Sequence, residues 1–135
     1  NPFIRDLMGL IAAEELGHME LIGTAIKKLG GTEFPAIKNS WKEAGNIRFS
    51  EEYKYILDMI KEDQEAEQRE ITLYSKHLKL TGDVHIKRML KFLIDREETH
   101  RTILKRSAAL LAQEAGNEHF SALIHDYKMS LRIVK

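Results

Sequence analysis

The sequence predicts an all-α protein built as a bundle of long helices. Only two prolines and eight glycines occur among the 135 residues, whereas the helix-favouring residues Leu, Ile, Lys, Glu and Ala are plentiful. Apolar residues recur at alternating steps of three and four along three long stretches, which is the pattern of helices that bury one face. The length suits one domain with a substantial core.

The first predicted helix begins at Asn1-Pro2 and runs to about Leu29. Asn is a favoured N-cap, and Pro is favoured at the first helical position. Gly30-Gly31 provides a glycine signal for the C-terminal end.

Residues 32–49 are predicted to form a long connection, with one helical turn around Trp41. Ser50 is the expected cap of a second long helix over residues 51–80. A connection of this length is unusual between adjacent helices. It is therefore expected to cross over along the length of the bundle.

A tight turn at Thr81-Gly82-Asp83 is predicted to separate the second helix from a third, with Asp83 as its N-cap. The third helix is expected to run to about Ala115 and to end at Gly116-Asn117. Because the turn is so short, the second and third helices should be antiparallel neighbours.

The last segment, residues 118–135, is predicted to be a weaker amphipathic helix. The expected organisation is therefore a bundle over residues 1–115 with three core helices, followed by a helical tail over residues 116–135. The apolar face of the tail is predicted to contain Phe120, Ile124, Tyr127 and Leu131.

Composition excludes several classes of function. Lys+Arg and Asp+Glu both number 21, so the net charge is zero and no global field favours nucleic acid or a membrane surface. The absence of cysteine excludes disulfides, zinc–thiolate sites, iron–sulfur clusters and thiol nucleophiles. No apolar run approaches the ~20 residues of a membrane span. The expected location is cytoplasmic, the default for a soluble chain with no visible signal.

Three predicted core stripes become polar near their middles. In the first and third helices the apolar stripe is interrupted by Glu-x-x-His, and in the second it is interrupted by acidic residues. The stripes are Ile4, Met8, Ile11, Glu15, His18, Ile22, Ala25, Leu29; then Tyr53, Ile56, Ile60, Asp63, Glu67, Glu70, Tyr74, His77; then Ile86, Leu90, Leu93, Glu97, His100, Leu104, Ser107, Leu111.

The polar interruptions are predicted to meet in one layer. Glu67 lies 14 residues before Thr81 and Glu97 lies 15 residues after Gly82, so both should sit at one height, roughly 20 Å above the turn. Carboxylates in a core are costly unless a counter-charge compensates them. Divalent metal ions would supply it, and Glu and His three residues apart project from one helix face.

A plainer interpretation applies to several other polar residues. Asp63 and Glu70 could each be a metal ligand, a partner of a ligand or a solvated charge, and Tyr74 could either hydrogen-bond a ligand carboxylate or simply fill the core. In the second helix, the residues expected to face solvent are Glu62, Glu65 and Gln68. Surface or boundary positions are expected for Glu14, Glu20, Glu98, His77, His85, His119 and His125.

With these motifs in place, the sequence resembles the ferritin-like di-metal carboxylate proteins over about residues 3–110. The stretch from Glu14 to Glu20 looks like the second-helix motif of manganese catalases, as does the region from Leu80 to His100. The spacing from Glu67 to Tyr74 is similar to that of rubrerythrins and manganese catalases. Further features similar to bacterioferritins are His18 followed by Leu29-Gly30-Gly31 and Pro35.

The resemblance implies a ferritin-like four-helix bundle with a long crossover and a site for two Fe or two Mn ions. It implies Glu15, His18, Glu67 and His100 as ligands, with Glu97 either a ligand or a close partner of one. Zero cysteines exclude the cysteine-ligated iron domain of classical rubrerythrins. The connection between the second and third helices is shorter than in manganese catalases.

The family also has a Glu on an earlier helix, which would precede Asn1. That helix could have been lost upstream, be supplied by a partner chain, or be replaced by the tail helix. The sequence favours loss upstream, because Asn1-Pro2 resembles the end of a preceding loop.

Three functions are compatible with the sequence. The first is a di-metal oxidoreductase acting on hydrogen peroxide or dioxygen, expected as a homo-oligomer of two or more chains with no nucleic-acid or membrane partner. The second is iron oxidation and storage, which needs a shell-forming oligomer. The third is a non-enzymatic interaction bundle with vestigial carboxylates, against which the two intact Glu-x-x-His motifs argue.

Overall fold

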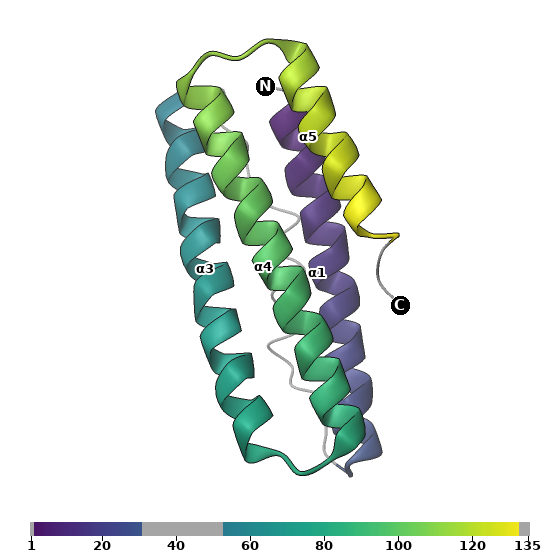
Figure 1. Ribbon diagram of the computed structural model, residues 1–135. Coiled ribbons are helices and arrows are strands. Elements are labelled where there is room, and N and C mark those ends of the chain that lie inside the picture. The colour runs from purple at the N-terminus through teal and green to yellow at the C-terminus, as the bar shows by residue number, and fades with distance from the viewer. Residues whose placement is uncertain (1, 31–52, 133–135) are drawn as a thin grey trace. The chain divides into compact units, whose positions relative to one another are not determined.

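The computed structural model describes residues 2–30 and 53–132, and these residues form helices without any strand (Figure 1). The all-α class is thereby confirmed. The predicted caps at Asn1 and Ser50, the long connection and the helical turn at Trp41 lie outside the described residues. The helices are α1 (Pro2–Lys28), α3 (Tyr53–Leu80), α4 (Val84–Ala112) and α5 (Asn117–Ser130).

The chain forms two compact units. One contains Asn1–Ile4 together with Ser50–Lys135, and the other is Arg5–Phe49. In the first unit α4 packs against both α3 and α5. The first residues of α1 belong to this unit as well, and Phe3 stacks on Phe120 of α5 with ring centroids 6.1 Å apart.

The predicted end of α1 is confirmed at Gly30. This residue has φ +86°, a left-handed conformation that only glycine adopts without strain, and its N–H donates to the carbonyl of Lys27 at 3.0 Å. Leu29, which we placed at the end of the buried stripe, lies beyond the last helical residue and is 68% exposed. The stripe prediction was wrong there because the chain has already left the helix.

The turn between α3 and α4 follows the prediction. Asp83 is extended (φ −78°, ψ 123°), and its Oδ1 accepts the backbone N–H of His85 at 2.8 Å and of Ile86 at 3.1 Å. These two donors belong to the helix N-terminus and would otherwise lack an acceptor. The cap and the short turn make α3 and α4 an antiparallel pair (Figure 1).

We expect the substitution Asp83→Asn to reveal a pH-dependent contribution of this cap. The backbone N–H groups of Ile86 and His85 favour the ionised carboxylate and lower the pKa of Asp83 below its ordinary value of 3.8. A lowered folded-state pKa stabilises the fold above the unfolded value, and this stabilisation is lost as pH falls through the folded-state pKa. The urea midpoint of the wild type should therefore be higher than that of Asp83→Asn at neutral pH. The two midpoints should converge in acid.

The matched control for this prediction is Asp95→Asn, because Asp95 is an exposed acidic residue of the same helix that caps nothing. Its difference from the wild type should be small. If the urea midpoints of Asp83→Asn and the wild type differed by the same amount throughout the acid titration, the proposed linkage would be contradicted.

The end of α4 differs from the prediction. The helix stops at Ala112 rather than near Ala115, because Glu114 adopts a left-handed conformation (φ 50°) and the N–H of Ala115 returns to the carbonyl of Leu110 at 3.0 Å. This closing bond reverses the chain three residues before the predicted stop. The reversal sends α5 back along α4 (Figure 1).

The tail helix packs on the bundle through a face only partly predicted. Phe120, Leu123 and Tyr127 are buried, whereas Ile124 is half-buried and Leu131 is 41% exposed. The prediction for Leu131 was wrong because the helix ends at Ser130. Two polar contacts fasten α5 antiparallel to α4: Arg96 with Ser130, and Arg106 with Asp126 at 2.9 Å.

The predicted core stripe of α4 is confirmed almost throughout. Every member from Leu90 onward is buried, including the polar ones, and Ile86 is half-buried. The α3 stripe is buried at Ile56, Ile60 and Glu67, and it becomes more exposed toward the turn. None of the described helices is both long enough and apolar enough to cross a membrane.

Candidate metal centre

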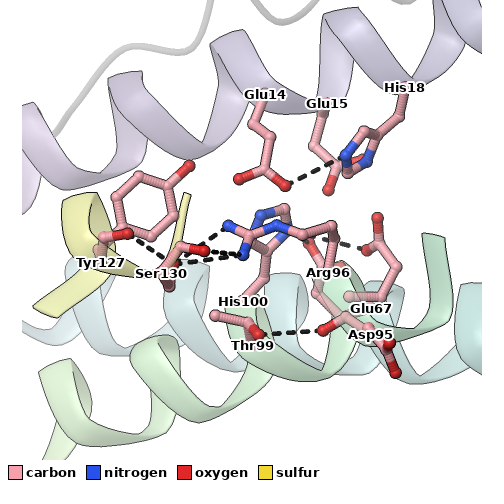
Figure 2. Close-up of polar contacts among 11 residues, drawn as sticks. Glu14, Glu15, His18, Glu67, Asp95, Arg96, Thr99, His100, Tyr127 and Ser130 are labelled. Carbon is pink, nitrogen blue, oxygen red and sulfur yellow. Dashed lines mark hydrogen bonds and ion pairs between the residues drawn. The ribbon is translucent and has the colours of Figure 1, made fainter. Parts of the chain in front are cut away.

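Three side chains able to bind metal come together between α3 and α4. Glu67 is 6% exposed, and Glu97 and His100 are fully buried. One ligand atom from each lies within 4.8 Å of the others. The Nδ1 atom of His100 is 3.6 Å from Oε1 of Glu67 (Figure 2). The same Nδ1 atom is 3.9 Å from Oε2 of Glu97. The predicted common height of Glu67 and Glu97 is confirmed, while metal ligation remains a prediction.

The local sequence explains why these polar groups are buried. Glu97 and His100 occupy the same stripe as Leu93 and Leu104, both of which are fully buried, so the helix face that drives packing carries the carboxylate and imidazole inward. Ile60 and Glu67 share a face of α3 in the same way.

The carboxylate of Glu67 is suited to binding a cation. Its Oε2 atom is buried and accepts no hydrogen bond from the described residues. A carboxylate offers about four lone-pair sites, and leaving one oxygen buried without a donor costs free energy. Two carboxylates beside one imidazole form an oxygen- and nitrogen-rich donor set, which suits Fe or Mn. The residues present therefore fit a metal ion.

The second Glu-x-x-His motif forms its own polar cluster on α1. Nδ1 of His18 lies 3.9 Å from Oε2 of Glu15, and Nε2 of His18 lies 3.1 Å from Oε2 of Glu14. The sequence prediction placed Glu14 on the surface, but its side chain is only 12% exposed. Residues four apart share a helix face, so the position of His18 brings Glu14 onto the same side.

The remaining candidates flank Glu67 along α3. Asp63, Glu70 and Tyr74 are all half-buried, at positions four before, three after and seven after Glu67. Their roles stay open. The other residues predicted at the surface are exposed, namely Glu20, Glu98, His77, His85, His119 and His125.

Sequence reasoning missed two residues beside the centre. Arg96 is 4% exposed and donates to Ser130, and Tyr127 is fully buried with its ring centroid 6.1 Å from that of His100. Tyr127 had been assigned to the apolar face of the tail but not to the centre. The spacing of Phe120, Leu123 and Tyr127 signals one helix face, although nothing in it indicates which helix that face contacts.

Comparison with known proteins shows the family of the chain. The family model named Rubrerythrin matches residues 1–108. The chain belongs to the rubrerythrin family. This membership places it in the ferritin-like di-metal superfamily, and the rubrerythrin domain is a ferritin-like helical bundle. The resemblance found in the sequence and the predicted fold class are both confirmed.

A more distant relative is a probable manganese catalase of Clostridium acetobutylicum. It is 24% identical over 136 aligned residues, which cover 87% of this chain and 60% of the relative. The chain therefore spans less than two thirds of the length of this relative. No solved structure gives a significant match. The rubrerythrin family match ends at residue 108, before α5 begins.

Proposed function

We propose that this protein is an oxidoreductase that binds two Fe or two Mn ions and acts on hydrogen peroxide or dioxygen. The observation that carries the proposal is the buried group formed by Glu67, Glu97 and His100 in a rubrerythrin-family bundle. Buried carboxylates that exceed the available counter-charge are expected where a cation completes the site.

The proposed ligand set combines both Glu-x-x-His motifs. Glu67, Glu97 and His100 would hold metal from α3 and α4, and Glu15 and His18 of α1 would supply the remaining ligands. The 3.9 Å separation between imidazole and carboxylate is the same in the two motifs, so each can present a nitrogen and an oxygen together. Paired motifs of this kind, with a further Glu between them, are the di-metal arrangement of ferritin-like bundles.

The metals and the protein would have different roles in the reaction. When bound, the metal pair would exchange electrons with hydrogen peroxide or dioxygen. The chain's own residues would set the position of the centre and keep bulk water out, since Glu97 and His100 are fully buried. Glu67 Oε2, buried and not engaged by a described donor, is an atom that can bind a cation or take up a proton.

Peroxide is the substrate that the comparisons favour. The relative from Clostridium acetobutylicum is named a probable manganese catalase. The motifs around His18 and His100 that resemble manganese catalases favour the same substrate class. We further propose that the chain assembles as a homo-oligomer of two or more copies.

The test is a metal count joined to an activity assay. The full chain is purified from medium containing both Fe and Mn, and metals per chain are measured by elemental analysis. About two ions per chain are expected. Oxygen release from added peroxide, or oxygen uptake after addition of Fe²⁺, is then followed with an oxygen electrode.

Matched variants assign the ligands. Glu67→Gln and Glu15→Gln should each lower the metal content, whereas Glu62→Gln and Glu20→Gln, at exposed positions of the same helices, should not. Full metal content in Glu15→Gln would remove Glu15 from the ligand set. A wild-type chain without metal even after reconstitution would overturn the proposal in favour of a vestigial site, and a cage-sized particle that stores iron would favour the storage function.

A further inference from the structure

Helix α5 reaches the candidate centre although it follows the family match. Tyr127 is fully buried, and its ring lies 6.1 Å from that of His100 with an interplanar angle of 40°. This is an aromatic contact of ordinary geometry between α5 and the imidazole of the centre. Figure 2 shows Tyr127 and Ser130 of α5 facing His100 and Arg96 of α4.

A second contact between α4 and α5 lies one helical turn beyond Tyr127 along α5. Arg96 donates through Nη1 to the carbonyl of Ser130 at 3.2 Å and through Nη2 to its Oγ at 3.2 Å, and the Ser130 hydroxyl donates to the carbonyl of Tyr127. Arg96 is itself buried, so this charge is satisfied in part by the end of α5. The bonds therefore hold the backbone of Tyr127 at a fixed height on α4.

We propose that Tyr127 is a positioning residue that holds the His100 ring in the orientation needed to bind metal. The hydrogen bonds between Arg96 and Ser130 keep Tyr127 in place. This inference rests on the proposed function. Metal-binding histidines depend on neighbours that fix the ring, and loss of such a neighbour typically lowers metal affinity about 10- to 100-fold. A packed aromatic ring restricts rotation of the imidazole about its Cβ–Cγ bond.

The proposal also implies that metal binding strengthens the docking of α5 on α4. If docking of α5 favours metal binding, then metal binding must favour docking of α5 by the same factor. Amide hydrogens of α5 near Tyr127 should therefore exchange more slowly when the centre is loaded. Amides in the first turn of α5, near Phe120, should change less because they lie away from His100.

The experiment compares Tyr127→Leu, Tyr127→Phe and Phe120→Leu in the full chain. Phe120 is the matched control because it is a buried aromatic residue of the same helix that stacks on Phe3. Co²⁺ is the probe, since its visible absorption reports the geometry of its ligands. Affinity is taken from a Co²⁺ titration below the melting temperature of every variant, and stability from thermal unfolding of the metal-free chains.

Tyr127→Leu should lower Co²⁺ affinity about tenfold or more and alter the Co²⁺ spectrum. Tyr127→Phe, which keeps the ring, should restore both. Phe120→Leu should lose comparable thermal stability yet keep the wild-type spectrum and an affinity within about twofold. Equal losses of affinity in Tyr127→Leu and Phe120→Leu, or a wild-type spectrum in Tyr127→Leu, would overturn the proposal and leave the proposed function standing. A wild-type chain that binds no metal would remove both.

Discussion

Replacing Glu97 with leucine is expected to stabilise the metal-free protein and to abolish its metal binding. Glu97 is fully buried in a stripe whose neighbours Leu93 and Leu104 are also fully buried. In the metal-free protein its carboxylate has been removed from water and lies close to the carboxylate of Glu67, and an apolar side chain of similar size avoids both the desolvation and the repulsion. The expected gain is about 1–3 kcal/mol in the free energy of unfolding.

Stability of the metal-free protein should rise while metal binding is lost, so one variant tests two opposite effects. Stability is measured by urea unfolding in the presence of a chelator, and metal content by elemental analysis. Glu98→Leu is the matched control: it makes the same chemical change at the adjacent exposed position and should alter stability by no more than about 0.5 kcal/mol. If Glu97→Leu instead destabilised the metal-free chain, the carboxylate would have a structural role of its own.

Removing metal from the loaded protein is expected to lower its melting temperature on the order of 10 °C. A ligand that binds only the folded state stabilises it by about 2.7 kcal/mol at a free concentration one hundred times Kd. For a chain of 135 residues, each kcal/mol shifts the melting temperature by a few degrees. Scanning calorimetry with Mn²⁺ or Fe²⁺, before and after chelation, measures the shift.

Site variants separate specific binding from a general effect of divalent ions. Glu67→Gln should melt at the same temperature with and without metal, whereas Glu62→Gln, which is exposed on the same helix, should show the wild-type shift. Identical melting of the wild type in both conditions would mean that these buried groups hold no ion under the conditions of the scan.

The sequence predicted the α3–α4 pair and its polar layer in detail. The Asp83 cap, the short turn and the α4 stripe all depend on local chemistry or on helical periodicity, both of which can be read along the chain. The two helices are joined by one short turn and have the same rise per residue. The shared height of Glu67 and Glu97 above the turn therefore followed from counting residues. The meeting of these residues with His100 needed no further information.

Other features could not be predicted because they depend on which helix packs against which face. Leu123 was not assigned to the buried face of α5, yet it is 1% exposed, and nothing in the sequence around Arg96 indicates that the end of α5 binds its side chain. An amphipathic helix shows that it has an apolar face but not what that face will contact. Glu14 was misassigned because its helix face is shared with His18.

By itself, then, the sequence determined the helical class, the helix ends at Gly30 and Asp83, and the buried level at which Glu67, Glu97 and His100 meet. Only the tertiary structure decided that α5 folds back onto α4 and places Tyr127 against His100. The physical reason is the range of the interactions. Caps, turns and helical periodicity act within a few residues of the chain, whereas Arg96 and Ser130 are 34 residues apart, and their contact exists only once the helices have packed.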